Sequence, residues 1–348
     1  MTPGEELEPL PYSATELDVA WPGWRDQMLS GYRWMVLGRS LDSRMLGLQR
    51  QGRVGFYGPA TGQEAVSVGV ALALQPADWV FPGLREQLIL LARGHPLGAY
   101  LDHLFANDRE PARGRQMPCH PTGRDVRYVS MSSVIGTQIT QAVGLGYGLK
   151  LRKEPAVSLA FFGDGATSAN DFHAGMNLAG VLGLPVLFCC TNNQWAISVP
   201  VEHQSRVAQL AEKANAYGMP GHRVDGTDLV AVHVAARDAL ARLRTGQGPE
   251  MLEFVLYRMT PHSSSDDPTR YQASDWMARA KRHDPVPRVE QLLERTGVLS
   301  AELKGSIAAE ADGAVRAAIE SAESVGPPAP ESLVTDVYAP AQGLRGAR

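Results

Sequence analysis

Residues 156–193 read AVSLAFFGDGATSANDFHAGMNLAGVLGLPVLFCCTNN, and this stretch decides the fold that we expect. The apolar runs at 156–162 and 185–190 have the length and composition of buried strands, and residues 168–182 between them have the spacing of a helix. Two parallel strands need such a crossover, because the chain must return to the same end of the sheet. The stretch therefore predicts parallel strands whose carboxyl ends lie at one edge.

The same alternation of strands and helices continues on both sides of this stretch. Further strands are predicted at 78–81 and 128–131, and a further αβ unit follows Asn193. Helices are predicted at 26–51, from 62, from 85, at 136–150 and within 286–324. Alternating elements of this kind predict an α/β fold with a parallel sheet and helices on both faces. Ligands of such sheets bind at the carboxyl ends of the strands.

The chain length of 348 residues fits one large domain with extensions better than two catalytic domains, since domains usually have ~100–200 residues. Residues 1–27, rich in Pro and Glu, are expected to form an N-terminal arm, 28–325 the α/β domain and 326–348 an extended tail. The polar segment 260–270 is rich in helix-breaking residues, which predicts a loop.

The composition excludes several kinds of partner. Hydrophobic residues make up 44% of the chain and charged residues 20%, as in globular proteins with a full core. A formal net charge of −4 without a Lys/Arg cluster argues against nucleic-acid binding. No apolar run reaches the ~18 residues of a membrane helix. The three cysteines include no C-x-x-C pair, which favours a reducing compartment and a cytoplasmic location.

The chemistry is predicted from two short motifs at the strand ends. Gly163-Asp164-Gly165 follows the first strand of the opening stretch, and Asn192-Asn193 follows the second after 26 residues, 166–191. A lone Gly-Asp-Gly is often only a turn. At the ends of neighbouring strands, however, the Asp164 carboxylate and the Asn193 amide oxygen would converge, and Mg²⁺ prefers such oxygen ligands together with phosphate oxygens. The glycines would let backbone N–H groups approach the phosphates.

This pair of motifs resembles the diphosphate-binding motif of thiamine-diphosphate enzymes. The resemblance extends over about 50–340 to the α subunits of the E1 component of 2-oxo acid dehydrogenases, and most closely to the branched-chain (2-oxoisovalerate) type. The matching stretches are 78–86 (DWVFPGLRE), 114–120 (GRQMPCH), 163–175 (GDGATSANDFHAG) with 192–198 (NNQWAIS), and 257–271 (YRMTPHSSSDDPTRY).

The resemblance implies a role for each matching residue. The metal ligands would be Asp164, the Asn193 side chain and the backbone carbonyl of Trp195. The cofactor would contact Leu84, Arg85, Ser133, Val134, Ile135, Gly163, Asp164, Gly165, Ala166, Asn193, Trp195, Ala196 and His262. The 2-oxo acid would lie near Phe56, Leu84, Met117, His120 and Ser133. His262 and Ser133 would be the catalytic residues of this chain.

The resemblance also implies partners and a reaction. The carboxylate that activates thiamine diphosphate belongs to a second domain, for which this chain has no room, so a β subunit would complete the site in an α2β2 tetramer. The enzyme would decarboxylate a 2-oxo acid and transfer the acyl group to the lipoyl group of the E2 component. A pyruvate or acetoin dehydrogenase α subunit is an alternative. The HSSSDD loop is the feature that argues against it and favours the branched-chain type.

Two departures from the family pattern leave a further alternative open. Leu84 stands where the family commonly has Tyr, and Thr191 stands where it often has a charged or polar contact. These substitutions would also suit a catalytically silent paralogue that assembles as a scaffold. Ser263 beside His262 suggests phosphate regulation of the loop, since an added phosphate would repel a diphosphate; an unmodified polar loop is the simpler interpretation.

Overall fold

The computed structural model describes residues 7–335, and within them five parallel strands form one sheet in the order β1-β2-β3-β7-β6. These strands are β1 (Trp79–Phe81), β2 (Ser158–Gly163), β3 (Val186–Asn192), β6 (Gly221–Asp225) and β7 (Glu250–Val255). A short antiparallel pair, β4 (Trp195–Ala196) and β5 (Val199–Pro200), follows β3. The predicted α/β fold with a parallel sheet is confirmed.

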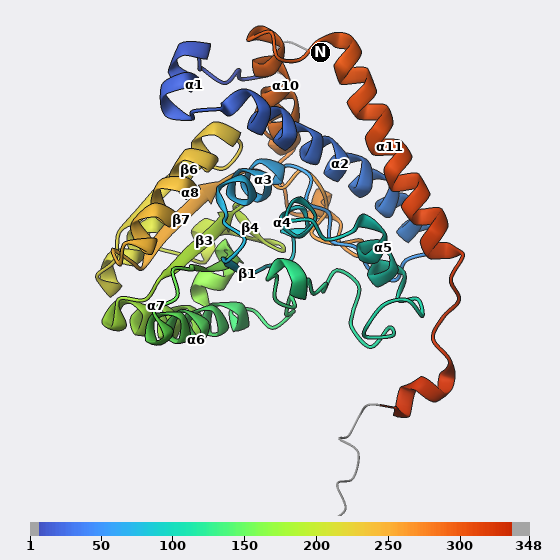
Figure 1. Cartoon of the computed structure of the whole chain (residues 1–348), viewed down its shortest axis with the longest axis horizontal. Helices are drawn as coiled ribbons and strands as arrows, with labels where there is room; N and C mark the ends of the chain where they lie inside the picture. The colour runs from blue at the N-terminus through green and yellow to red at the C-terminus, as the bar shows by residue number, and fades with distance from the viewer. Residues whose placement is uncertain (1–6, 336–348) are drawn as a thin grey trace, which may run out of the picture.

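Helices precede, connect and follow the strands (Figure 1). The α-helices are α1 (Ala14–Ala20), α2 (Trp24–Arg50), α3 (Glu64–Ala73), α4 (Gln87–Ala92), α5 (Leu97–Phe105), α6 (Thr137–Arg152), α7 (Asn170–Leu182), α8 (Leu229–Arg244), α9 (Trp276–Arg282), α10 (Pro285–Arg295) and α11 (Ala301–Glu323). The 3₁₀ segments are η1 (Arg124–Val126), η2 (Asp164–Ser168), η3 (Val201–His203), η4 (Leu210–Tyr217), η5 (Pro268–Arg270) and η6 (Pro330–Val334).

The sheet is covered on both faces because successive side chains of each strand point to opposite sides. Phe161 and Cys189 belong to the apolar cluster that includes residues of α2, α3 and α8, whereas Phe162 and Cys190 belong to the cluster with α6 and α7. Figure 1 shows α6 and α7 together on one side of the sheet. Both cysteines are free and 0% exposed, so they fill the core on either side.

Two local expectations were wrong. Residues 128–131 form no strand: Tyr128 makes only isolated bridges, to Val80 of β1 and to Gly123, because the chain folds back there through η1. The segment expected to provide the helix before β6 is the 3₁₀ segment η4 rather than an α-helix. The sheet therefore ends at β1 on this side, and the Tyr128 segment continues as a loop toward Ser133.

The residues preceding α2 pack against the domain. Ser13 caps α1 by accepting from the Glu16 N–H, and Trp21 stacks on His233 of α8 with ring centroids 3.9 Å apart. Arg295 of α10 donates to the carbonyl of Leu10 over 2.7 Å. The described part of the expected arm thus includes a helix and side chains buried against α8 and α10; residues 1–6 lie outside the described range.

The C-terminal part of the described chain follows α11, which lies beside α2 (Figure 1). Its residues 326–335 include η6, and Arg115 of the loop after α5 donates to the carbonyl of Thr335 over 2.9 Å. The expected tail is therefore not wholly extended, and its residues 336–348 lie outside the described range. Among the described residues no helix is both long enough and apolar enough to cross a bilayer.

Candidate functional site

The candidate site lies where β2 and β3 end side by side. Gly163, the last residue of β2, is in register with Thr191 of β3. The chain leaves β2 directly into η2, which begins at Asp164, and leaves β3 into Asn193. Asp164 is 2% exposed and Asn193 8% exposed. The structure thus brings the two motifs to one edge of the sheet, as the sequence predicts.

Asp164 is a buried carboxylate whose direct side-chain partner is a neutral amide. Nε2 of Gln204 donates to its Oδ2 over 3.3 Å. Burial raises the pKa of Asp164 to about 6, because the charged form has lost much of its water. A cation beside this carboxylate would offset that cost, so the group fits a metal-binding role.

In the turn after Asp164, the backbone at Gly165 lies close to the backbone at Ala196. A Cβ atom on Gly165 would lie 2.6 Å from Cβ of Ala196, which is closer than atoms can pack. Ala166 is buried, and the hydroxyl of Thr167 donates to the carbonyl of Asp164 over 2.8 Å, which closes the turn. Glycine is therefore required at 165 so that η2 can lie against the β4 segment.

The Asn193–Trp195 turn follows β3 at the same edge of the sheet and carries two candidate ligand oxygens. Oδ1 of Asn193 accepts from the backbone N–H of Trp195 over 3.2 Å, and Gln194 between them has a φ of 70°. The carbonyl of Trp195 accepts from Arg258 over a long 3.5 Å. Both oxygens have a second lone pair, so both can still accept a further ligand.

Arg85 links the start of α4 to the loop that carries His262. Its guanidinium donates to the carbonyl of His262 over 2.6 Å and to the carbonyl of Pro59, and the side chain is buried. Burial, followed by the neighbouring charge of Arg258, lowers the pKa of Arg85 to about 10. A bound anion would compensate this buried cation, as expected for a phosphate-binding arginine.

His262 is neutral at physiological pH. Burial and the charge of Arg85 lower its pKa to about 4. Nδ1 of His262 lies 3.3 Å from Nη2 of Arg85, which can only donate. The lone pair must therefore be on Nδ1 and the proton on Nε2. His262 consequently offers an N–H donor without a positive charge.

A network in the 257–271 segment supports this histidine. The carboxylate of Asp266 accepts from the backbone N–H of His262 over 2.7 Å and from the hydroxyl of Tyr271 over 2.5 Å. Burial alone would raise the pKa of Asp266, but these hydrogen bonds leave it lowered. Arg258 donates to Tyr271 over 2.5 Å and to the carbonyl of Ile197 over 2.8 Å. The network thereby joins the His262 loop to the Trp195 segment.

A second group of predicted residues gathers around His120. Nε2 of His120 lies 2.5 Å from the hydroxyl of Ser133, and its Nδ1 lies 2.9 Å from the carbonyl of Pro118. The Sγ of the preceding Cys119 accepts from the backbone N–H of Gly58 over 3.4 Å, which ties this loop to the segment of Phe56. Gly58 in turn lies under the side chain of Leu84.

The remaining predicted residues of this group are partly exposed. Phe56 and Leu84 are half-buried, and Met117, Val134 and Ile135 are 44%, 67% and 62% exposed. Apolar side chains therefore face outward beside His120 and Ser133. Thr191, in contrast, is buried and donates to the carbonyl of Phe162 over 3.2 Å, so its hydroxyl serves the sheet rather than the site.

Comparison with known proteins identifies the family. A family model described as dehydrogenase E1 component matches residues 32–331, which is most of the chain. The chain belongs to this family. Its members depend on thiamine diphosphate.

Several relatives within the family are about 40% identical to this chain. The 2-oxoisovalerate dehydrogenase subunit alpha of Bacillus subtilis is 39% identical over 88% of this chain and 94% of its own length. Subunit alpha 1 of the mitochondrial enzyme of Arabidopsis thaliana is 40% identical over 88% of this chain, which spans 65% of the length of that relative. The pyruvate dehydrogenase E1 component subunit alpha of Bacillus subtilis is 39% identical over 90% of this chain and 81% of its own length.

Four residues that contact the site were not predicted from the sequence, namely Gln204, Arg258, Asp266 and Tyr271. Three of them lie in the quoted stretch 257–271, where a tyrosine and a carboxylate flanking the loop were a usable signal. Gln204 lies outside every motif, so only the fold brings it to Asp164.

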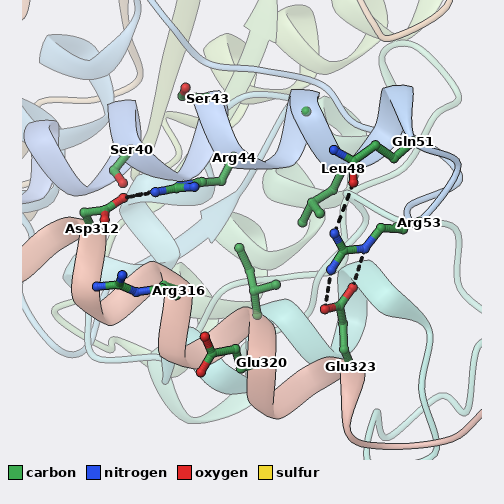
Figure 2. A pocket seen from close by; sticks show the side chains of 12 residues that line it. Ser40, Ser43, Arg44, Leu48, Gln51, Arg53, Asp312, Arg316, Glu320 and Glu323 are labelled. Atoms are coloured by element: carbon green, nitrogen blue, oxygen red, sulfur yellow. Dashed lines mark hydrogen bonds and ion pairs between the residues drawn. The ribbon is translucent and has the colours of Figure 1, made fainter.

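A separate groove of about 570 Å³ lies between α2 and α11 (Figure 2). Its walls are held together by the ion pairs Arg44–Asp312, at 2.7 Å, and Arg53–Glu323. None of the residues predicted for the site lines it. Ion pairs thus cross the groove between the α2 side and α11, and the groove lies apart from the predicted site residues.

Proposed function

We propose that this chain is the α subunit of the E1 component of a branched-chain 2-oxo acid dehydrogenase and that it holds thiamine diphosphate through Mg²⁺. The observation that carries the proposal is the register of Gly163 with Thr191, because it places the buried Asp164 and Asn193 at one sheet edge. The membership of the chain in the E1 family supports the cofactor.

In this proposal the metal is held by the Asp164 carboxylate, the Asn193 amide oxygen and the Trp195 carbonyl. Among the described residues no three His, Cys, Asp or Glu side chains cluster as a metal site. A mixed set of one carboxylate, one amide and one carbonyl suits a cation that also binds phosphate oxygens and water. The close approach at Gly165 would leave the backbone N–H groups near Ala166 free to face those phosphates.

Arg85 and His262 would bind the diphosphate. Arg85 provides a buried positive charge, and His262 provides an Nε2–H donor without a charge of its own. The proposed surface around the cofactor is completed by Leu84, Ser133, Val134, Ile135 and Ala196. The bound cofactor would supply the electron sink that allows the carboxylate of a 2-oxo acid to leave as CO₂.

On the substrate side the chain would orient the 2-oxo acid and move a proton. The carbonyl of Pro118 faces Nδ1 of His120, so in the neutral imidazole the proton lies on Nδ1 and Nε2 accepts from the Ser133 hydroxyl. Ser133 can thus lose its proton to His120 or have it returned. Phe56 and Met117 would border the acyl chain and exclude water from it.

A β subunit would complete the site in an α2β2 tetramer, and the E2 component would accept the acyl group on its lipoyl arm. Exposed apolar side chains beside the site, Val134 and Ile135, support a partner surface there, since such residues are usually covered. The three free, buried cysteines support a reducing, cytoplasmic location.

The substrate class is supported by the names of the relatives, since the Bacillus subtilis 2-oxoisovalerate subunit is matched over nearly its whole length. A pyruvate dehydrogenase α subunit is the second candidate, because a relative of that name has the same 39% identity. A dye-linked assay with a panel of 2-oxo acids separates them. Turnover of pyruvate well above 2-oxoisovalerate would reject the branched-chain assignment, and normal assembly without any turnover would favour a scaffold.

The central experiment is calorimetry of thiamine diphosphate and Mg²⁺ with the chain co-expressed with its β subunit. Asp164→Ala and Asn193→Ala should each abolish measurable Mg²⁺-dependent binding, whereas Asp238→Ala, on the exposed face of α8, should bind as the wild type does. Unchanged affinity in either site variant would overturn the metal assignment.

A further inference from the structure

Glu253 is a buried carboxylate that the proposed mechanism does not use. It lies on β7, in register with Cys190 of β3, and is 0% exposed. Its Oε1 accepts from Nδ2 of Asn192 over 2.7 Å, and its Oε2 accepts from the backbone N–H of Ala211 over 2.9 Å. Each partner lies on a segment that leads to the candidate site. The two carboxylate oxygens therefore hold two different segments in place.

The first oxygen controls the turn that follows β3. With Nδ2 of Asn192 held by Glu253, Oδ1 of Asn192 accepts from the backbone N–H of Gln194 over 3.0 Å. That contact stabilises the left-handed backbone conformation of Gln194, which has a φ of 70°. Residues other than glycine rarely adopt this conformation. The conformation determines the directions of the Asn193 side chain and the Trp195 carbonyl on either side of Gln194.

The second oxygen anchors η4 behind the Asp164 turn. Ala211 is the second residue of η4, and Lys213 of the same segment donates to the hydroxyl of Thr167 over 3.0 Å. Thr167 in turn donates to the carbonyl of Asp164 over 2.8 Å. One carboxylate, on the interior strand β7, is therefore connected to both halves of the site. These halves are the segment that follows β2 and the segment that follows β3.

We propose that Glu253 is a positioning residue that sets the geometry of the Asp164, Asn193 and Trp195 oxygens. This inference rests on the proposed function, because those oxygens are the proposed metal ligands. Its hydrogen bonds go to Asn192 and to Ala211 of η4, and through these it is linked to the three oxygens. Outer partners of this kind commonly change metal affinity by ~10–100-fold when they are removed.

The hydrogen-bond directions give a sharp pair of variants. In Glu253→Gln one of the two oxygens becomes an NH₂ group, which faces a donor on either side and breaks one link. In the double variant Glu253→Gln with Asn192→Asp, the new NH₂ group can donate to the new carboxylate at position 192. The other oxygen of that carboxylate still accepts from Gln194, while the remaining amide oxygen at position 253 accepts from Ala211. The double variant has the same net charge as the wild type and every donor again has an acceptor.

Glu250 provides a matched control on the same strand. It is also 0% exposed, but it lies at the opposite end of β7 and accepts from Arg242 over 2.6 Å. Glu250→Gln removes a buried charge from the same strand without touching either segment of the site. A general weakening of β7 would affect the Glu250 and Glu253 variants alike, whereas a positioning role affects only Glu253.

The first measurement is amide hydrogen exchange of the cofactor-free assembly. Glu253→Gln should accelerate exchange at 192–197 and 164–168 by at least tenfold, the double variant should restore it, and Glu250→Gln should leave both segments unchanged. Equal acceleration in the Glu250 and Glu253 variants, or no acceleration in Glu253→Gln, would overturn the proposal. If Glu253→Gln does not assemble, an assembled double variant with wild-type exchange supports the proposal, and a double variant that also fails rejects it.

The second measurement is Mg²⁺ affinity by calorimetry at saturating thiamine diphosphate. Glu253→Gln should weaken Mg²⁺ binding by ~10–100-fold, the double variant should return it to within about threefold of the wild type, and Glu250→Gln should leave it unchanged. The positioning role would be rejected if Glu253→Gln changes amide exchange as expected but binds Mg²⁺ with the affinity of the wild type. Absence of Mg²⁺-dependent binding in the wild type itself would reject the proposed function, while the exchange data would still decide whether Glu253 orders the two segments.

Discussion

The hydroxyl of Ser133 lies 2.5 Å from Nε2 of His120, and the opposite ring nitrogen of His120 faces the Pro118 carbonyl at 2.9 Å. In the neutral imidazole this carbonyl fixes the tautomer, so that Ser133 is the donor and His120 the acceptor. Two side chains that come from separate loops thus form a hydrogen-bonded pair beside the candidate site.

This pair makes a kinetic prediction. His120→Ala should lower kcat with a 2-oxo acid by ~100-fold or more, as for loss of a proton-transferring group, while Ser133→Ala should cost about tenfold. The His120 change should leave thiamine-diphosphate affinity within about twofold of the wild type. A dye-linked assay and calorimetry on the same preparations measure both quantities. A His120 variant that loses cofactor affinity but keeps kcat would place the residue on the cofactor instead.

Gly165 makes a steric prediction. A methyl group there would lie 2.6 Å from Cβ of Ala196, so Gly165→Ala should push η2 and β4 apart and weaken cofactor binding by ~10-fold or more. Removing the opposing methyl in Gly165→Ala with Ala196→Gly should recover most of the affinity. Calorimetry of the two variants measures this, and failure of the second change to help would show that the contact with Ala196 is not the cause.

The loop of His262 makes a prediction about order. Tyr271→Phe removes the hydroxyl that donates to Asp266 and accepts from Arg258, both over 2.5 Å. We expect faster amide exchange at 260–268 and a thiamine-diphosphate affinity lowered by about fivefold, since a net hydrogen bond stabilises by ~1 kcal/mol. Tyr12→Phe, which removes a 2.8 Å hydrogen bond to Asp228 far from this loop in the chain, is the control. Equal exchange in both variants would contradict a local role.

His233 makes a prediction about pH. Burial lowers its pKa to about 4, whereas in the unfolded chain a histidine titrates near 6.5. The unfolded state therefore binds the proton first, and stability falls as pH drops from about 6.5 toward 4. At pH 5 this amounts to about 2 kcal/mol relative to pH 8. In His233→Phe, whose ring can still stack on Trp21, that part of the pH dependence should vanish from denaturant titrations. A wild-type slope in the variant would exclude His233 as its source.

Much of the site was predictable because its residues are local in sequence. The strand of residues 156–162 and the strand of residues 185–190 were recognised from their apolar runs, and the crossover between them requires parallel pairing. The sequence alone therefore predicts that Asp164 and Asn193 lie at one edge. The expected strand at 128–131 failed because a short apolar run in a hairpin-like turn has the same composition as a strand, and only pairing partners distinguish them.

The sequence by itself determined the α/β class, the order of the elements around 156–193 and the residue types that can hold Mg²⁺ and diphosphate, because each of these depends on periodicity and on short spacings. The tertiary structure alone decided that Gln204 meets Asp164, that Arg85 meets the His262 loop, and that Glu253 joins both halves of the site. These contacts connect residues 40, 177 and 61 positions apart, and no local pattern encodes them. They exist because packing of the sheet and its helices brings distant polar groups into a buried region, where each must find a partner.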